Sequence, residues 1–208
     1  EISECLVGSE MCIRDRYRCL FRIGGKCMPV VDMPLEELKK YTGTNPIPTD
    51  FDLFWDERLK EVNNCKLNYK IEPSEIQGYE SCDYYDLWFE GIDGGKVYAK
   101  YIHPKSDEKL PLILQFHGYP GASRGWFEQS SFAGMGCAII AMDCPGQGGK
   151  SEDVGGKRGT TVSGHIVAGL DDEPENMYYV RLFQNTSILC RLSLIHISEP
   201  TRHSLISY

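Results

Sequence analysis

A glycine-rich turn follows an apolar run, and its residue types suit acyl-transfer chemistry. Residues 110–116 form the run, and the turn is His117-Gly118-Tyr119-Pro120-Gly121. Ligands bind in open α/β sheets at such turns, beyond the carboxyl ends of parallel strands. Gly118 lets the chain turn sharply and present a bare backbone N–H. An N–H fixed in this way stabilises the negative charge that develops on a carbonyl oxygen in acyl transfer. The alternative is an ordinary turn with His117 hydrogen-bonded locally.

A second motif, at residues 121–125, matches the G-x-S-x-G pattern of a nucleophilic serine at Ser123. That pattern requires its serine at the tip of a strand, with a helix starting at once. Here the strand has ended at Phe116, and Gly118 and Pro120 intervene. We therefore expect a glycine-rich loop with a solvated Ser123 that is not a nucleophile.

A third motif, at residues 143–151, ends in Gly149-Lys150-Ser151 and suggests a phosphate loop. The first glycine of that motif would fall at position 144, which is Cys144. Because this glycine lets the backbone curl around a phosphate, its replacement counts against the interpretation. A phosphate-loop nucleotide-binding protein remains the alternative enzyme class.

Other residues that could do chemistry stand alone. His103 and His165 are single histidines in expected loops, and residues 171–173 are acidic but are typical of a solvated turn. No C-x-x-C pair or comparable histidine spacing occurs, so we expect no metal site.

The hydrophobic pattern predicts the elements that position these motifs. Short β-rich or apolar runs predict strands, and a 3.6-residue period predicts helices. The expected strands are residues 67–71, 84–89, 97–102, 110–116 and 137–142. The expected helices are 34–41, a segment capped by Asp50, 127–134 and 176–190. The turn at Asp93-Gly94 predicts a hairpin, and residues 110–142 predict a βαβ unit of the α/β class.

Composition narrows the class of protein. The 208 residues are 41% hydrophobic and 25% charged, and the formal charge is −8. A net acidic chain without a basic run is a poor candidate for binding nucleic acid or an anionic membrane. No apolar run approaches the length of a membrane span, and no secretory signal opens the sequence. Nine cysteines without a paired pattern favour a reducing, cytoplasmic location.

Both ends of the sequence differ from its middle. Residues 1–27 and 192–208 show no sustained period, and residues 5–16 and 194–202 resemble translated sequencing-adapter read-through. We therefore expect three segments: an artefactual or disordered 1–27, a partial domain over 28–191, and a second such segment over 192–208. Neither end should pack on the core.

Several motifs in the middle, taken together, resemble one known family. They are residues 33–41, 50–55, 116–121, 146–149, 164–166 and 169–172. In their order and spacing they resemble the acetyl xylan esterase/cephalosporin-C deacetylase family of α/β-hydrolases, over about residues 31–191.

The resemblance implies a fold, a reaction and site residues. The fold would be the N-terminal half of an α/β-hydrolase: a mostly parallel sheet with helices on both faces and antiparallel strands at its N-terminal side. The reaction would be deacetylation of acetylated xylo-oligosaccharides and cephalosporin-type esters by a Ser-His-Asp triad, without metal or cofactor. The Tyr119 N–H would be an oxyanion donor, and Gly118 and Gln147 would contact substrate. Such enzymes are typically cytoplasmic homo-oligomers, often hexamers.

Two features depart from the family pattern. Pro145 stands where the family usually has an arginine. The resemblance implies that this arginine tethers the active-site loops, and Pro145 cannot replace its charge. The family's G-S-Q-G-G nucleophile motif does not occur in the sequence, and its triad Asp and His would follow that motif. We therefore expect a truncated, inactive half of an acetyl esterase. The non-enzyme alternative is a carbohydrate-binding module that uses Trp88 and Trp126.

Overall fold

The computed structural model describes residues 21–23, 26–28, 33–159 and 164–194. The chain divides into two compact units, Glu1–Thr49 and Asp50–Tyr208. In the first unit, β1 (Phe21–Ile23) pairs antiparallel with β2 (Lys26–Met28), and a short helix, α3, covers Leu35–Leu38. Part of the segment 1–27, which was expected to be artefactual or disordered, thus forms a small hairpin.

The second unit is built on a five-stranded sheet with the order β3-β4-β5-β7-β6. Its strands are β3 (Tyr69–Pro73), β4 (Cys82–Glu90), β5 (Lys96–Pro104), β6 (Leu112–Phe116) and β7 (Ala138–Met142). Three of the four pairings are antiparallel, and only β6 and β7 are parallel. The α/β class is confirmed. Within the described residues the sheet is mostly antiparallel, because this part of the fold holds the antiparallel strands and a single βαβ unit.

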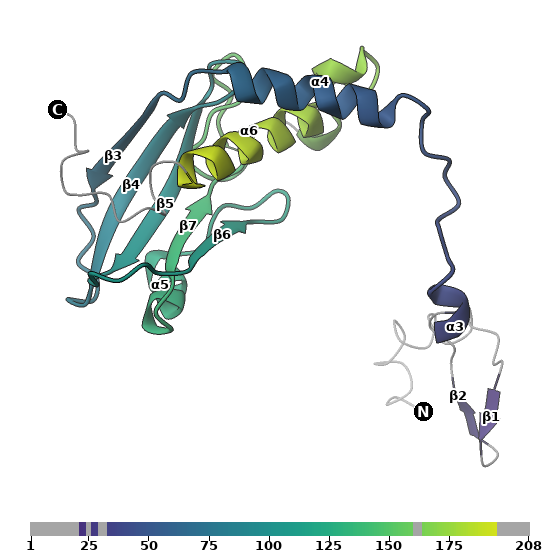
Figure 1. The fold of residues 1–208 in the computed structure, drawn as a ribbon, viewed down its shortest axis with the longest axis horizontal. Coiled ribbons are helices and arrows are strands. Elements are labelled where there is room, and N and C mark those ends of the chain that lie inside the picture. The colour runs from purple at the N-terminus through teal and green to yellow at the C-terminus, as the bar shows by residue number, and fades with distance from the viewer. Residues whose placement is uncertain (1–20, 24–25, 29–32, 160–163, 195–208) are drawn as a thin grey trace, which may run out of the picture. The chain divides into compact units, whose positions relative to one another are not determined.

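Helices cover both faces of the sheet, as the apolar pattern of its strands requires. On one face, α4 (Phe51–Asn64) and α6 (Tyr178–Leu192) pack over the larger core, to which they contribute Val62, Ile188 and Leu189. On the other face, α5 (Trp126–Gly134) packs over a smaller core around Tyr84 and Ile139. Figure 1 shows α4 and α6 side by side on one side of the strands, with α5 opposite.

Most predicted elements are confirmed, with shifts at their ends. The hairpin between β4 and β5 turns at Gly94, which has a positive φ of 78°. Asp50 precedes α4 as predicted, but its side chain makes no capping hydrogen bond. The helix α6 extends through Leu192, which is fully buried, whereas Leu194 is 68% exposed. The packed domain therefore runs slightly past the boundary expected at residue 191.

The tryptophans of the carbohydrate-binding alternative pack within the fold. The Trp88 ring lies 4.9 Å from the Tyr98 ring, and the Trp126 ring lies 5.8 Å from that of Tyr84. An all-antiparallel sheet would have favoured that alternative, and the parallel pair β6–β7 argues against it.

None of the helices in the described part of the chain is long and apolar enough to cross a membrane.

Candidate functional site

Two loops meet at the carboxyl ends of the parallel strands β6 and β7. The β6 loop (residues 117–125) leads into α5, and the β7 loop (residues 143–153) follows Met142. Their meeting follows from the parallel register, which pairs Phe116 with Met142 at the ends of the two strands. The first and third sequence motifs are thereby brought together at one edge of the sheet, where ligands bind in open α/β sheets.

His117 joins the two loops at the strand ends. Its Nε2 accepts a hydrogen bond from the Cys144 N–H at 2.8 Å, and its Nδ1 lies 3.0 Å from the Gly118 carbonyl oxygen. A ring nitrogen that accepts from a backbone N–H carries no proton, so the proton is assigned to Nδ1, which donates to Gly118. The local hydrogen bonding considered for His117 is thus present, and it spans both loops.

Tyr119 lies in the exposed part of the β6 loop. The residue is 39% exposed, and the turn closes with a hydrogen bond from the Gly121 N–H to the Gly118 carbonyl oxygen at 2.9 Å. Within the described residues, no hydrogen-bond acceptor is found for the Tyr119 N–H. This backbone donor can therefore meet a group that approaches from solvent.

The backbone conformation at position 118 does not require a glycine. Its φ is not positive, and a Cβ added there would meet nothing within 4 Å. The sequence predicted that a sharp turn here would need a glycine. The turn instead forms with a backbone conformation that other residues can also adopt. Gly118 instead leaves open space beside Tyr119.

Ser123 lies in the loop before α5, as predicted, but it is buried rather than solvated. Its Oγ donates to Asp143 Oδ1 at 2.5 Å and accepts from Lys100 Nζ at 2.5 Å. Glycine-rich composition suggests exposure, whereas these two partners, Lys100 of β5 and Asp143 of the β7 loop, hold the hydroxyl in the interior. No described histidine is hydrogen-bonded to Ser123, so it lacks the base that a nucleophilic serine requires.

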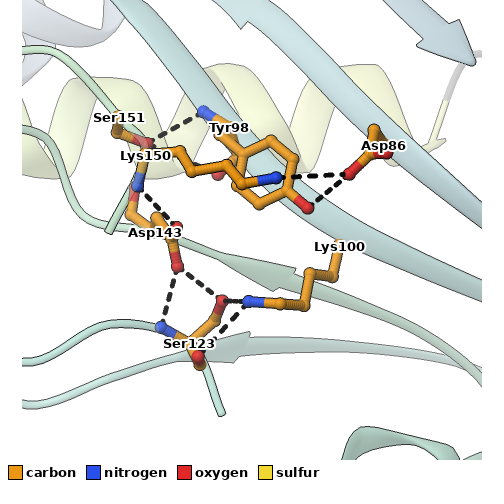
Figure 2. A network of polar contacts seen from close by, with 7 residues as sticks. All are labelled: Asp86, Tyr98, Lys100, Ser123, Asp143, Lys150 and Ser151. Atoms are coloured by element: carbon orange, nitrogen blue, oxygen red, sulfur yellow. Dashed lines mark hydrogen bonds and ion pairs between the residues drawn. The ribbon is translucent and has the colours of Figure 1, made fainter. Parts of the chain in front are cut away.

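The Asp143 carboxylate lies between Ser123 and Lys150 and is hydrogen-bonded to both, as Figure 2 shows. Oδ1 accepts from the Ser123 N–H at 2.8 Å, and Oδ2 accepts from the Lys150 N–H at 2.9 Å. The Lys150 ammonium lies over the Tyr98 ring, 4.4 Å from its centroid, and 3.9 Å from Asp86. A phosphate loop needs free N–H groups and a free lysine around an anion. Here a carboxylate already occupies the loop, which argues against the phosphate-loop alternative.

Gln147 lies in the β7 loop, and its side chain is buried. Its Nε2 donates to the Tyr178 hydroxyl at 2.7 Å, and that hydroxyl donates to the Pro145 carbonyl oxygen at 2.9 Å. Burial raises the pKa of the Tyr178 phenol, so it stays a neutral donor. At Pro145 the loop is therefore held through its backbone carbonyl, to a tyrosine of α6 that sequence reasoning did not find.

The surroundings of the remaining candidate site residues indicate structural or surface positions. His165 is buried, with Nε2 3.3 Å from Asp153 Oδ2, and Arg181 lies 3.5 Å from the same carboxylate. His103, which was expected in a loop, instead lies on β5, because the strand extends to Pro104, and its ring lies 6.0 Å from the Tyr101 ring. Residues 171–173 are exposed. Among the described residues, no three His, Cys, Asp or Glu side chains gather as a metal site would require.

Lys100 is a second site residue that sequence reasoning missed, besides Tyr178. It lies on β5, and its ammonium reaches Ser123 beneath the β6 loop. Burial lowers the pKa of Lys100, while the nearby Asp143 carboxylate opposes that shift. A charged residue between Tyr98 and Ile102, on the same face of β5, was the available signal.

Comparisons with known proteins identify the family to which the chain belongs. Residues 28–200 match the family model described as Acetyl xylan esterase (AXE1). Acetyl xylan esterase 1 from Thermoanaerobacterium sp. JW/SL YS485 is 40% identical, with a TM-score of 0.72 over 80% of this chain. An acetyl xylan esterase from Paenibacillus sp. R4 is 30% identical, with a TM-score of 0.64 over 76% of this chain. The matches cover 52% of each solved chain, so this sequence spans about half the length of these relatives.

Proposed function

Because the chain belongs to the acetyl xylan esterase family, we propose that it is part of a carboxylic ester hydrolase that removes acetyl groups. The proposed substrates are acetylated xylo-oligosaccharides and cephalosporin-type acetyl esters. The proposed mechanism is that of a Ser-His-Asp triad: the serine attacks the ester carbonyl, the histidine moves the proton, and the aspartate orients the histidine.

We propose that this chain supplies the oxyanion side of the site. The observation that carries the proposal is the Tyr119 N–H, which lies in an exposed turn and has no acceptor within the described residues. Attack on an ester places negative charge on the carbonyl oxygen, and a fixed N–H stabilises that charge more in the transition state than in the ground state. Gly118 leaves room for the ester beside this donor.

The contribution proposed for Gln147 is indirect. Its side chain is only 2% exposed, and its amide bonds Tyr178 rather than facing solvent. Gln147 therefore supports substrate binding by fixing the β7 loop, against which the β6 loop packs. The Gly148 N–H makes that contact, donating to the carbonyl oxygens of Pro120 and Gly121 at 3.2 and 2.9 Å.

The chain alone is proposed to be inactive. The motif Gly-Ser-Gln-Gly-Gly is not found in its 208 residues, and no described serine is hydrogen-bonded to a described histidine. An oxyanion donor without a nucleophile and a base cannot form an acyl-enzyme.

The setting of the enzyme is also proposed. The described cysteines at 65, 82, 137, 144 and 190 have free thiols, which supports a reducing, cytoplasmic location. The proposed reaction requires no cofactor. Nucleic acid and membranes are not expected partners. The whole protein is proposed to be a homo-oligomer, with a hexamer as the expected state.

A complementation assay tests the proposed function. The chain is produced together with the part of the Thermoanaerobacterium enzyme that it does not match, giving a completed enzyme, and acetate release from acetylated xylo-oligosaccharides is measured. We expect no release by either part alone and release by the pair, abolished by a serine-directed inhibitor. Hydrolysis by the chain alone that depends on Ser123, or a folded pair without activity, would contradict the proposal.

A further inference from the structure

A buried charge network fastens the β6 loop to the β7 loop on the far side of Tyr119 from His117. The Asp143 side chain is 2% exposed, and its carboxylate accepts three donors: the N–H and Oγ–H of Ser123 and the N–H of Lys150. A carboxylate buried so deeply is costly unless its oxygens are hydrogen-bonded. Here the donors come from both loops, so satisfying the charge also joins the loops.

Lys100 completes the network from the sheet below. Its Nζ donates to Ser123 Oγ at 2.5 Å and lies 3.3 Å from the Ser123 carbonyl oxygen. The ammonium therefore faces the carboxylate through the serine hydroxyl, and its positive charge offsets the negative charge of Asp143. Figure 2 shows Ser123 between the two charged groups, which come from β5 and from the end of β7.

The network is one of three anchors on the β6 loop. His117 is bonded to the Cys144 N–H at the start of the loop, and Gly148 donates to the carbonyl oxygens of Pro120 and Gly121 in its middle. Ser123, bonded to Asp143 and Lys100, holds the end of the loop. Tyr119 lies between the first two anchors, with no hydrogen bond of its own N–H among the described residues.

We propose that Asp143, Ser123 and Lys100 are positioning residues. They hold the β6 loop in the position from which the Tyr119 N–H can donate a hydrogen bond to the reacting carbonyl oxygen. The role of Tyr119 rests on the proposed function, whereas the coupling between the loops does not. A donor acts in catalysis only when its position is fixed before the charge develops. The three side chains act through the loop and do not themselves contact substrate.

The coupling can be measured without any esterase assay. The Gly148 N–H bridges the loops, so its hydrogen exchange reports their contact, and amides of α6 report global opening. Exchange is followed by mass spectrometry on the full chain, with residue-level fragmentation, at low concentration. The variants are Ser123→Ala, Lys100→Met and Ser123→Thr, which restores the hydroxyl. Ser131→Ala is the matched control, because Ser131 Oγ also donates, to Glu128, but on the exposed face of α5.

We expect Ser123→Ala and Lys100→Met to speed exchange at Gly148 about tenfold or more, as the loss of a hydrogen bond to a charged group implies, with less change in α6. Ser123→Thr should recover most of the protection, and Ser131→Ala should leave it unchanged. Unchanged exchange at Gly148, or equal acceleration in Gly148 and α6, would overturn the proposal. Neither result depends on acetate release, so failure here is distinct from failure of the esterase assay.

Discussion

The ring of His117 accepts a hydrogen bond at Nε2 from the backbone N–H of Cys144, across 2.8 Å. The two residues follow adjacent parallel strands, so this bond fixes the spacing of the loops that leave β6 and β7. The Nδ1–H is used at the same time on the Gly118 carbonyl oxygen, 3.0 Å away. The neutral form of His117, with its proton on Nδ1, is therefore the form that this contact requires.

Removing the acceptor at His117 should destabilise the fold. His117→Ala leaves the Cys144 N–H without its partner, at a cost of about 1–2 kcal/mol in the free energy of unfolding. His117→Gln should lose less, because the glutamine Oε1 can reach the place of Nε2 and accept the same hydrogen bond. Urea unfolding gives both values. His103→Ala is the control, and equal losses at positions 103 and 117 would contradict the account.

An added methyl group at Gly149 should displace the Asp143 carboxylate. A Cβ there would lie 2.2 Å from Asp143 Cγ and Oδ2, too close for any side chain without movement. We expect Gly149→Ala to lower the free energy of unfolding by about 1–3 kcal/mol, as overpacking does. Gly134→Ala is the matched control, because a Cβ at the end of α5 meets nothing within 4 Å. A loss at Gly149 no larger than at Gly134 would contradict this reading.

The Cys144 thiol should make the fold less stable in alkali. Burial raises the pKa of this thiol from its ordinary value of 9.0 to about 11. Between these values the unfolded chain releases the proton and the folded chain keeps it, so stability falls as pH rises. Cys144→Ala should therefore show a shallower loss of unfolding free energy between pH 9 and 11 than the parent. The tyrosines with raised pKa are present in both proteins and cancel. A parent slope in Cys144→Ala would refute the assignment.

The open edge of β6 should drive self-association. Among the described strands, β6 pairs only with β7, and Phe116 at its end is 42% exposed. An apolar strand with unpaired N–H and C=O groups is a template for edge pairing. We expect Phe116→Lys to reduce concentration-dependent association in sedimentation velocity. Phe127→Lys, which changes an exposed phenylalanine on α5, should not. The edge is not the cause of association if both variants behave alike.

Sequence patterns were sufficient for elements whose signal is local. The apolar runs at β6 and β7 and the Asp93-Gly94 turn each report their own structure. Side-chain pairing across the fold has no such signal. Ser123 is 20 residues from Asp143 and 23 from Lys100, and the three meet only because β7 pairs with both β5 and β6. The burial of Ser123 could not be read from a glycine-rich loop for the same reason, and neither could the contact of Gln147 with Tyr178.

The most direct test of the account removes one atom group, the Tyr119 N–H. In the completed enzyme, Tyr119 is replaced by p-hydroxyphenyllactic acid, which turns the backbone amide into an ester and keeps the side chain. If this N–H stabilises the oxyanion, kcat for acetate release should fall about 10²–10³-fold with little change in KM. The same replacement at Tyr79, an exposed tyrosine outside the site whose N–H donates to the Tyr84 hydroxyl, controls for the loss of a backbone N–H elsewhere in the fold. An unchanged kcat at Tyr119, in a protein that folds as the parent does, would contradict the claim that this chain supplies the oxyanion donor.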